Sequence, residues 1–346
     1  MSTPPQATAS ARSRILQILG YGLAVICLVW VLRDFHIRLA LHDMANANWN
    51  WVLIGIIFDV LSYGVQALRW KFLLTPFGRV PLTRCTRAVY AGLFANLVFP
   101  LRPGEFLRSY LISNSEGITL GRVLGSVGVE RLVDLVIATA SLAVVSLFVE
   151  LPRRFKRAAD TLGIITLVLL TIVVLLILYL EIKLGQDSSE EAPKVGGPHL
   201  PGKLMGVLSG LHAIGTAPSF YPAVLASLLM PFCQCVALWA MMRSYGLNLS
   251  FLAAVVVLLV INLGVSLPNA PANMGAYQFF CVLGLKVFQI ESNTATGFSF
   301  FAWAALTLPF VFLGFAALLR TGLSFRSMRE KVSGFRGSER EPVSSP

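Results

Sequence analysis

The chain has 346 residues, of which 56% are hydrophobic and only 13% are charged. A soluble domain carries about 25% charged residues, so this chain lacks the polar side chains that would cover a soluble fold. The composition therefore predicts a protein whose outer surface meets lipid. The net charge of +11 comes mostly from basic residues beside apolar segments, which is typical of cytoplasmic flanks that contact anionic headgroups. These residues form no aromatic-interleaved surface, so nucleic-acid binding is not expected.

The motifs of common catalytic and metal centres do not occur in the sequence. The five cysteines lie mostly inside apolar segments without a CxxC pair, and the four histidines lie in connecting regions. There is no Cys/His cluster, no H-E-x-x-H motif and no phosphate-binding G-x-x-x-x-G-K-[ST] loop. We therefore expect no metal, no other cofactor and no ATP-driven pump within this chain.

The first 150 residues contain four apolar segments. Residues 1–12 are rich in proline and serine and are expected to be disordered. The apolar run 15–32 is longer than a signal-peptide core and lacks a clear cleavage site, so we expect a retained helix. A second helix is predicted from Trp49 to Leu74, with tryptophans near its start that suit a membrane interface. A third apolar stretch covers residues 88–112, and a fourth covers residues 120–149.

The third stretch is interrupted at Pro100–Glu105, because two prolines and a glycine within these residues cannot continue a helix. In the second half, residues 251–290 are interrupted in the same way at Pro268–Gly275. The other predicted elements of the second half are an aliphatic helix, a polar linker, two further helices and a basic cytoplasmic tail, at about 162–180, 183–218, 221–242, 298–319 and 321–346. We predict a single all-α membrane domain from residue 13 to residue 320.

The two halves, about residues 13–150 and 161–320, follow one order. Each has two uninterrupted helices, then a broken helix, then another uninterrupted helix, and an Asn-Leu pair precedes each break at Asn96 and Asn262. Paired interruptions at corresponding places are typical of transport sites between structural repeats. If the broken segments are re-entrant hairpins, each half crosses the membrane three times, and if they span it, four times. Both versions, with six to eight crossings, place the termini in the cytoplasm, but they disagree about the basic loop 153–157.

The first break carries ionisable residues, which cost about 2.5–3.5 kcal/mol each at the bilayer centre. These residues are Arg102, Glu105 and Arg108. Unwound backbone at that depth lines a cavity or is buried in protein, and the planar arginine side chain suits bidentate phosphate binding. We predict that the two arginines bind a phosphate, while Glu105 orients an arginine or contacts a cationic headgroup. The alternative is an interfacial turn whose arginines extend to lipid headgroups.

Further polar residues lie inside other apolar segments. Glu130 and Asp134 share a helix face and Arg131 can reach Asp134, which makes this trio either an ion network that fixes packing or part of the site. The amides Asn96 and Asn262 can bridge helices. The second break offers the neutral donors and acceptors Asn269, Asn273, Tyr277 and Gln278.

The second helix also contains polar side chains along its length. Asp59, Gln66 and Arg69 all lie within this helix. The run Arg69–Lys71 near its end is interpreted as an interface anchor.

Residues 96–108, 128–134 and 268–278 resemble the lysylphosphatidylglycerol synthetase transmembrane-region family, also called the flippase-like-domain family, and Arg69-Trp70 matches a weaker signature. The chain departs from the family pattern at Ala272 and Asn273, where members carry glycines, and at Gln278, where they often carry an acid. The resemblance implies a stand-alone member without the soluble synthase domain. In fused members the module moves aminoacylated phosphatidylglycerol between leaflets, and stand-alone members are associated with hopanoid, polyprenyl-glycan or cardiolipin pathways.

We therefore expect an inner-membrane lipid translocase for a phosphate-bearing lipid: a phospholipid, an aminoacyl-phospholipid, or a polyprenyl- or hopanoid-linked lipid. Its expected partners are membrane lipids and a separate cytosolic or membrane lipid-synthesis enzyme. Two alternatives are a non-transporting scaffold of a lipid- or glycan-synthesis complex and, less favoured, a headgroup-modifying enzyme with Glu130 or Asp134 as base. The last lacks a nucleophile–base pair, so no enzyme is expected. The predicted substrate-binding residues are Arg69, Asn96, Arg102, Glu105, Arg108, Glu130, Arg131, Asp134, Asn269, Asn273 and Gln278.

Overall fold

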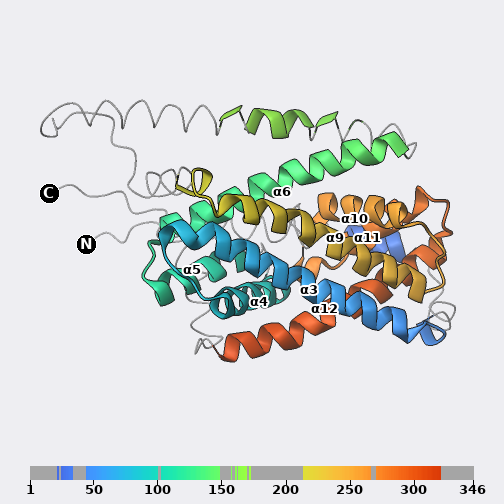
Figure 1. The fold of residues 1–346 in the computed structure, drawn as a ribbon. Coiled ribbons are helices and arrows are strands. Elements are labelled where there is room, and N and C mark those ends of the chain that lie inside the picture. The colour runs from blue at the N-terminus through green and yellow to red at the C-terminus, as the bar shows by residue number, and fades with distance from the viewer. Residues whose placement is uncertain are drawn as a thin grey trace, which may run out of the picture. The chain divides into compact units, whose positions relative to one another are not determined.

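The computed structural model describes residues 22, 25–33, 44–99, 103–148, 157, 160–161, 163–169, 171–172, 213–265 and 270–320. These residues form α-helices, two short 3-10 helices and connecting turns, and they contain no strand (Figure 1). The helices are α3 (Trp49–Leu74), η1 (Thr75–Phe77), α4 (Leu82–Val98), α5 (Gly104–Glu116), α6 (Leu120–Phe148), α9 (Phe220–Ser244), α10 (Phe251–Val265), η2 (Pro271–Asn273), α11 (Ala276–Lys286) and α12 (Ser292–Leu319).

Four of the described helices are long and apolar enough to cross a membrane: α3 with the η1 turn, α6, α9 and α12. The 26 residues of α3 extend about 39 Å at 1.5 Å per residue, which exceeds the roughly 30 Å thickness of a hydrocarbon core. Large apolar side chains are exposed along these helices, among them Leu53 and Ile57 of α3 and Phe312 of α12. Such a surface suits lipid rather than water, and the predicted all-α polytopic membrane architecture is confirmed.

The chain forms two compact units. Unit 1 comprises residues 1–64, 87–108 and 231–346, and unit 2 comprises residues 65–86 and 109–230. The boundaries fall inside α3, α4, α5 and α9, so each of these helices contributes residues to both units. The division into two sequence repeats stays a prediction.

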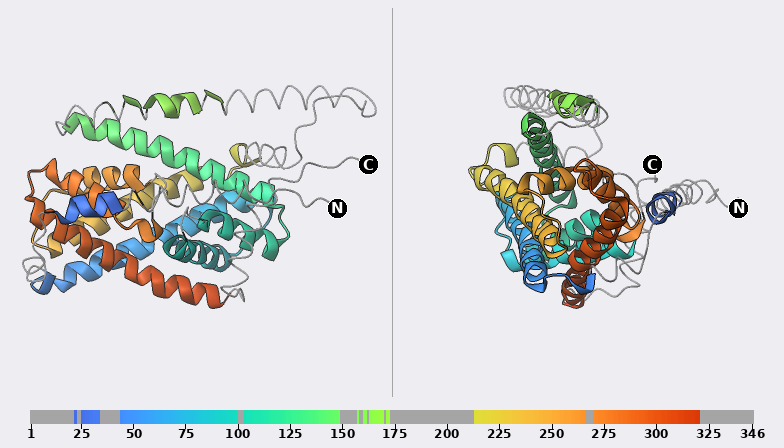
Figure 2. Two further views of the ribbon diagram at one scale, coloured as in Figure 1. Left: turned by 180° about the vertical axis from the view of Figure 1, so that it is seen from behind. Right: turned by 90° about the vertical axis from the view of Figure 1, so that its right-hand side faces the viewer.

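The core of unit 1 forms where α11 packs between α10 and α12. Its buried side chains include Leu238 of α9, Ile261 of α10 and Phe298 of α12. The α12 helix also lies along the second part of α4 (Figure 2), where a Cβ added at Gly314 would stand 2.8 Å from the backbone oxygen of Tyr90. Small residues therefore let these helices approach closely.

Both broken segments are helical hairpins: α10 and α11 of the second lie within unit 1, as do the facing parts of α4 and α5 at the first break. A Cβ added at Gly92 of α4 would lie 2.7 Å from the backbone oxygen of Gly104 in α5. Likewise, a Cβ at Gly284 of α11 would lie 3.1 Å from Cα of Val257 in α10. The four helices contain 17, 13, 15 and 11 residues, fewer than the roughly 20 that a transmembrane helix needs. The predicted interruptions are confirmed, and short hairpins are the geometry that the re-entrant alternative requires.

Unit 2 joins the second part of α3 to α6 and to the first part of α9. Its apolar core contains Leu73, Val129 and Ala223. The indole nitrogen Nε1 of Trp70 donates a hydrogen bond of 3.0 Å to Oγ of Ser126, which ties α3 to α6. These contacts place polar residues of α3 and α6 opposite one another inside the unit.

Candidate functional site: a polar cavity and a separate buried charge cluster

A charge cluster lies in the interior of unit 2, between α3 and α6. Nη2 of Arg69 donates to Glu130, and Nη1 of the same arginine donates to Asp134. The side chains of Arg69 and Glu130 are 1% and 0% exposed. Gln66 adds a 3.2 Å hydrogen bond from Nε2 to Oε1 of Glu130, and Nη1 of Arg131 lies 3.4 Å from Oδ2 of Asp134. The prediction that Arg131 reaches Asp134 is thereby confirmed.

The two arginines and two carboxylates of this cluster cancel in formal charge. Removing an ion from water costs several kcal/mol unless a partner compensates for it, and here every charge has a partner of opposite sign. The interpretation of Arg69–Lys71 as an interface anchor is therefore wrong for Arg69 and also for Trp70, which is completely buried. Their side chains point into the protein because α6 supplies their hydrogen-bond partners.

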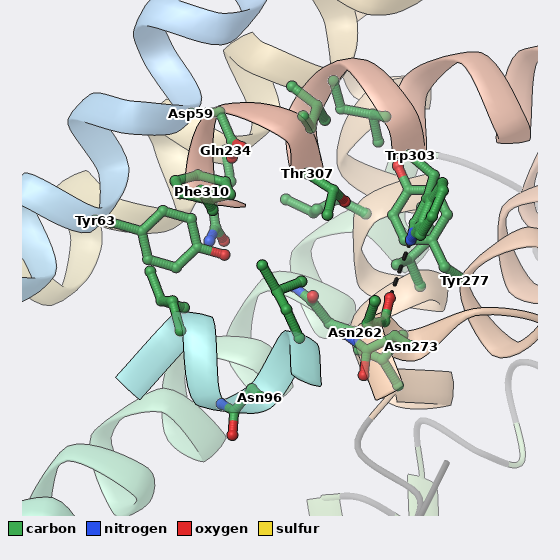
Figure 3. A pocket seen from close by; sticks show the side chains of 18 residues that line it. Asp59, Tyr63, Asn96, Gln234, Asn262, Asn273, Tyr277, Trp303, Thr307 and Phe310 are labelled. Atoms are coloured by element: carbon green, nitrogen blue, oxygen red, sulfur yellow. Dashed lines mark hydrogen bonds between the residues drawn. The ribbon is translucent and has the colours of Figure 1, made fainter. Parts of the chain in front are cut away.

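A cavity of about 200 Å³ lies within unit 1. It is enclosed by α3, α4, α9, α10, α11, α12 and the η2 turn (Figure 3). Its polar lining residues are Asp59, Tyr63, Asn96, Gln234, Asn262, Asn273, Tyr277, Trp303 and Thr307, and leucine, isoleucine and other apolar side chains complete the wall. Within an otherwise apolar bundle, this concentration of hydrogen-bonding groups marks the cavity as the candidate site.

The second hairpin supplies one wall of the cavity through an irregular turn. Ala272 and Asn273 both have φ of 55°, a left-handed conformation that favours glycine. Nε1 of Trp303 donates a 3.0 Å hydrogen bond to the backbone oxygen of Ala272, drawn as the dashed line in Figure 3. Oε1 of the buried Gln278 accepts from the backbone nitrogen of Gly275 at 2.8 Å. These bonds hold Asn273 at the cavity, while Gln278 fixes the start of α11 and does not line the cavity.

The first hairpin supplies Asn96. Its Oδ1 accepts a 2.7 Å hydrogen bond from the backbone nitrogen of Gly104, so Asn96 bridges α4 and α5 as the sequence predicts. Arg108 is 3% exposed, and Glu105 lies in the first turn of α5, but neither residue lines the cavity. Of the predicted site residues, Arg102 and Asn269 lie outside the described residues.

The electrostatic character of the cavity follows from Asp59. This residue of α3 is 8% exposed and is the only carboxylate among the lining residues that the structure describes. The same part of the chain contributes no arginine, lysine or histidine to the lining. The described wall is thus a set of neutral donors and acceptors around one acid, and the predicted arginine–phosphate contact stays a prediction.

The structure brings together two predicted site residues, Asn96 and Asn273, with three that the sequence marks only as polar or bridging, Asp59, Asn262 and Tyr277. It also adds residues that the sequence analysis missed: Tyr63, Gln234, Trp303 and Thr307. Each missed residue is a single polar or aromatic side chain in an apolar helix. The available signal was that an amide such as Gln234 in a membrane helix needs a hydrogen-bonding partner.

Long helices with exposed apolar side chains and short hairpins beside a polar cavity define a polytopic α-helical membrane protein. Residues 17–314 match the family model described as the lysylphosphatidylglycerol synthase TM region. The chain belongs to this family, which confirms the resemblance found in the sequence.

Three curated proteins illustrate the range of similarity. A UPF0104 membrane protein of Methanothermobacter thermautotrophicus is 24% identical over 284 residues, which cover 77% of this chain and 83% of that protein. A UPF0104 membrane protein of Methanocaldococcus jannaschii is 28% identical over 126 residues, covering 36% of each chain. A protein of Haloferax volcanii named glycosyltransferase AglD is 25% identical over 123 residues, which are 35% of this chain but only 20% of that protein.

Proposed function

We propose that this chain translocates a phosphate-bearing lipid between the two leaflets of the inner membrane. The observation that carries the proposal is that residues from both hairpins, Asn96 and Asn273, line one polar cavity in an apolar bundle. A lipid headgroup that crosses a bilayer needs hydrogen-bonding partners where water is absent. Broken helices that meet at one site are a recurrent way to provide them.

The cavity volume of about 200 Å³ suits a polar headgroup without its acyl chains. In this proposal the chains stay in lipid, beside exposed apolar side chains such as Leu308 and Phe312 of α12. Amides and hydroxyls of the cavity contact headgroup oxygens. Arg102 and Arg108 at the first break bind the phosphate outside the cavity, because Arg108 does not line it. Candidate cargoes are a phospholipid, an aminoacyl-phospholipid, or a polyprenyl- or hopanoid-linked lipid.

We propose binding and transfer rather than catalysis. The described lining contains no serine, cysteine or histidine that could form a nucleophile–base pair. The acids Glu130 and Asp134 are ion-paired to Arg69 in unit 2, which makes them poor candidates for a general base. We also place both termini in the cytoplasm, on the basis of their basic flanks.

The decisive experiment measures lipid movement by the purified full chain in vesicles of phosphatidylglycerol and phosphatidylethanolamine. A fluorescent phosphatidylglycerol placed in the inner leaflet is quenched by dithionite once it reaches the outer leaflet. We expect Asn262→Leu to abolish probe movement, because it replaces an amide of the cavity with an apolar side chain of similar size. The matched control is Asn248→Ala, whose exposed amide pairs with Arg243 outside the cavity. Equal movement by wild type and the Asn262→Leu variant would contradict the proposal.

The lipid that co-purifies with the protein gives a second test. Mass spectrometry of gently purified wild type should show a phospholipid or polyprenyl phosphate enriched over the bulk membrane. The enrichment should disappear in the Arg102→Ala/Arg108→Ala variant, and Glu105→Gln should alter it. The same bulk-like lipids in all samples would mean that the arginines are interfacial and hold no phosphate.

A second candidate function is a scaffold for a lipid- or glycan-synthesis enzyme. The match to 20% of the Haloferax volcanii protein named as a glycosyltransferase favours it, since a region like this one occurs there within a much longer chain. In that case a partner enzyme would lose activity when this chain is deleted. Asn262→Leu would restore the activity as well as wild type does, because a scaffold does not use the cavity.

A further inference from the structure

Among the residues that the structure describes, Asp59 has no compensating charge, unlike the other two acids in the long apolar helices. Glu130 and Asp134 are paired with Arg69. Asp59 forms no salt bridge with any residue that the structure describes, yet it is 8% exposed and lines the cavity. Figure 3 shows its side chain among those that line the cavity.

The groups that line the cavity together with Asp59 come from every helix that encloses it. The ionisable ones are the hydroxyls of Tyr63 and Tyr277. Outside the lining, the hydroxyl of Tyr90 interacts with Asp59 and donates to the backbone oxygen of Val60 at 3.1 Å, and the thiol of Cys281 is close to Tyr277. The helices α9, α10 and α12 contribute only neutral groups, which are Gln234, Asn262, Trp303 and Thr307. None of these neighbours can supply the positive charge that an ionised carboxylate needs.

An unpaired carboxylate in a low-dielectric interior is stable in its neutral form or next to a bound cation. Resting on the lipid translocation proposed above, we propose that Asp59 is the proton-binding site of the cavity and couples lipid movement to a proton. When water fills the cavity, the carboxylate is solvated and loses its proton. When the cavity closes around a headgroup and water leaves, the carboxylate takes up one proton and becomes a carboxylic acid.

The proton balance of this cycle is simple. One proton passes from water on one side of the membrane to an oxygen of Asp59, and the same proton leaves to water on the other side. No bond of the lipid is made or broken. A proton needs only one oxygen, whereas a metal ion needs several placed oxygen ligands. The described lining offers one carboxylate among neutral groups, which favours the proton.

The first experiment detects protonation without transport. Infrared difference spectra between acidic and alkaline buffer are recorded for the full chain in detergent. We expect the carbonyl band of a protonated carboxylic acid in wild type, its loss in Asp59→Asn, and a shifted band in Asp59→Glu. The matched control is Glu291→Gln, which neutralises an exposed acid at the start of α12 and should keep the band. Identical spectra for wild type and Asp59→Asn would overturn the proposal.

The second experiment applies a pH gradient to the vesicle assay with fluorescent phosphatidylglycerol. If one proton accompanies each lipid, a gradient of one pH unit should shift the leaflet distribution of the probe by up to about tenfold in wild type. Asp59→Asn should leave the distribution even, whereas Asp59→Glu and Glu291→Gln should respond to the gradient. A distribution in wild type that follows a sodium gradient and ignores pH would overturn the proton assignment.

The two readouts separate this inference from the proposed function. Probe movement in wild type that ignores the pH gradient would overturn the coupling and leave lipid translocation standing. Conversely, an infrared band that depends on Asp59, with no movement of the probe in any sample, would count against lipid translocation and leave the protonation site standing.

Discussion

The charge cluster of unit 2 and the cavity of unit 1 differ in whether their buried charges have partners of opposite sign. Around Arg69 the charges cancel, and the side chains of Arg69 and Glu130 at the centre of the cluster are almost fully buried. At Asp59 an acid of the same helix, α3, faces a hollow lined by neutral groups. Of the two, the acid without a described partner is the one that we infer to be functional, since a compensated cluster can serve packing alone.

The largest effect that would test this comparison is expected at Arg69. Arg69→Ala leaves Glu130 without its buried partner and should lower the free energy of unfolding by about 3–5 kcal/mol. Denaturant unfolding in mixed micelles measures the change. Arg84→Ala is the control, because its 2.6 Å ion pair with Glu116 has an arginine that is 49% exposed, so the loss should stay below about 1 kcal/mol. Equal losses of unfolding free energy for both variants would mean that the buried ion pair contributes no more to stability than the exposed one.

The stability of the hairpin that supplies Asn96 to the cavity should depend on close backbone contact between α4 and α5 rather than on charge. Gly92→Ala would place a Cβ 2.7 Å from the backbone oxygen of Gly104, and such overpacking should cost about 1–3 kcal/mol. The same unfolding assay measures the loss. The control is Gly64→Ala in α3, where nothing lies within 4 Å of the added Cβ, so helix propensity should make this variant up to about 1 kcal/mol more stable. An unchanged free energy of unfolding for Gly92→Ala would mean that α4 and α5 pack less tightly than the structure shows.

Neutralising Asp59 should change the free energy of unfolding in the opposite direction from the Arg69→Ala substitution. Asp59→Asn removes an acid with no described basic partner, and we expect the free energy of unfolding to rise by about 1 kcal/mol while lipid movement stops responding to a pH gradient. Unfolding and vesicle assays on one preparation check both parts. A large loss of stability would show that Asp59 is structural, like Glu130.

The smallest expected effect concerns the η2 turn. Ala272 has φ of 55°, which costs a residue with a Cβ about 1–2 kcal/mol. Ala272→Gly relieves that cost but adds freedom to the unfolded chain, so the net gain in stability should be about 0.5 kcal/mol. The comparison variant is Gly64→Ala, which makes the reverse exchange in a regular helix. A loss on Ala272→Gly would mean that the methyl group makes a packing contact.

The sequence predicts the helices well because each is a long apolar run with clear ends. The predicted bounds of α3, Trp49–Leu74, agree with the structure. The predicted start of α12 at Phe298 is six residues late, since the helix begins at Ser292 and its first turns contain Asn293 and Thr296. Both polar residues are buried, so tertiary packing stabilises a helical start that hydropathy alone does not reveal.

The site is harder to predict because its residues are neighbours only in three dimensions. The partner of Glu130 is 61 positions away in the sequence, so local spacing could not identify Arg69. The breaks are visible as Pro/Gly interruptions, and from them Asn96 and Asn273 could be proposed. In contrast, Gln234 and Thr307 sit in regular helices, and only the packing of α9 and α12 brings them to the cavity.

Two prolines lie inside helices that border the cavity. Pro231 of α9 is three residues before Gln234, and Pro309 of α12 follows Thr307 by two residues. Because a proline lacks the N–H that would bond to the preceding turn, each helix has one fewer restraint there and bends more easily. Each helix is therefore less restrained within one turn of a cavity residue. We expect that bending at these two prolines can change the width of the cavity without unwinding either helix.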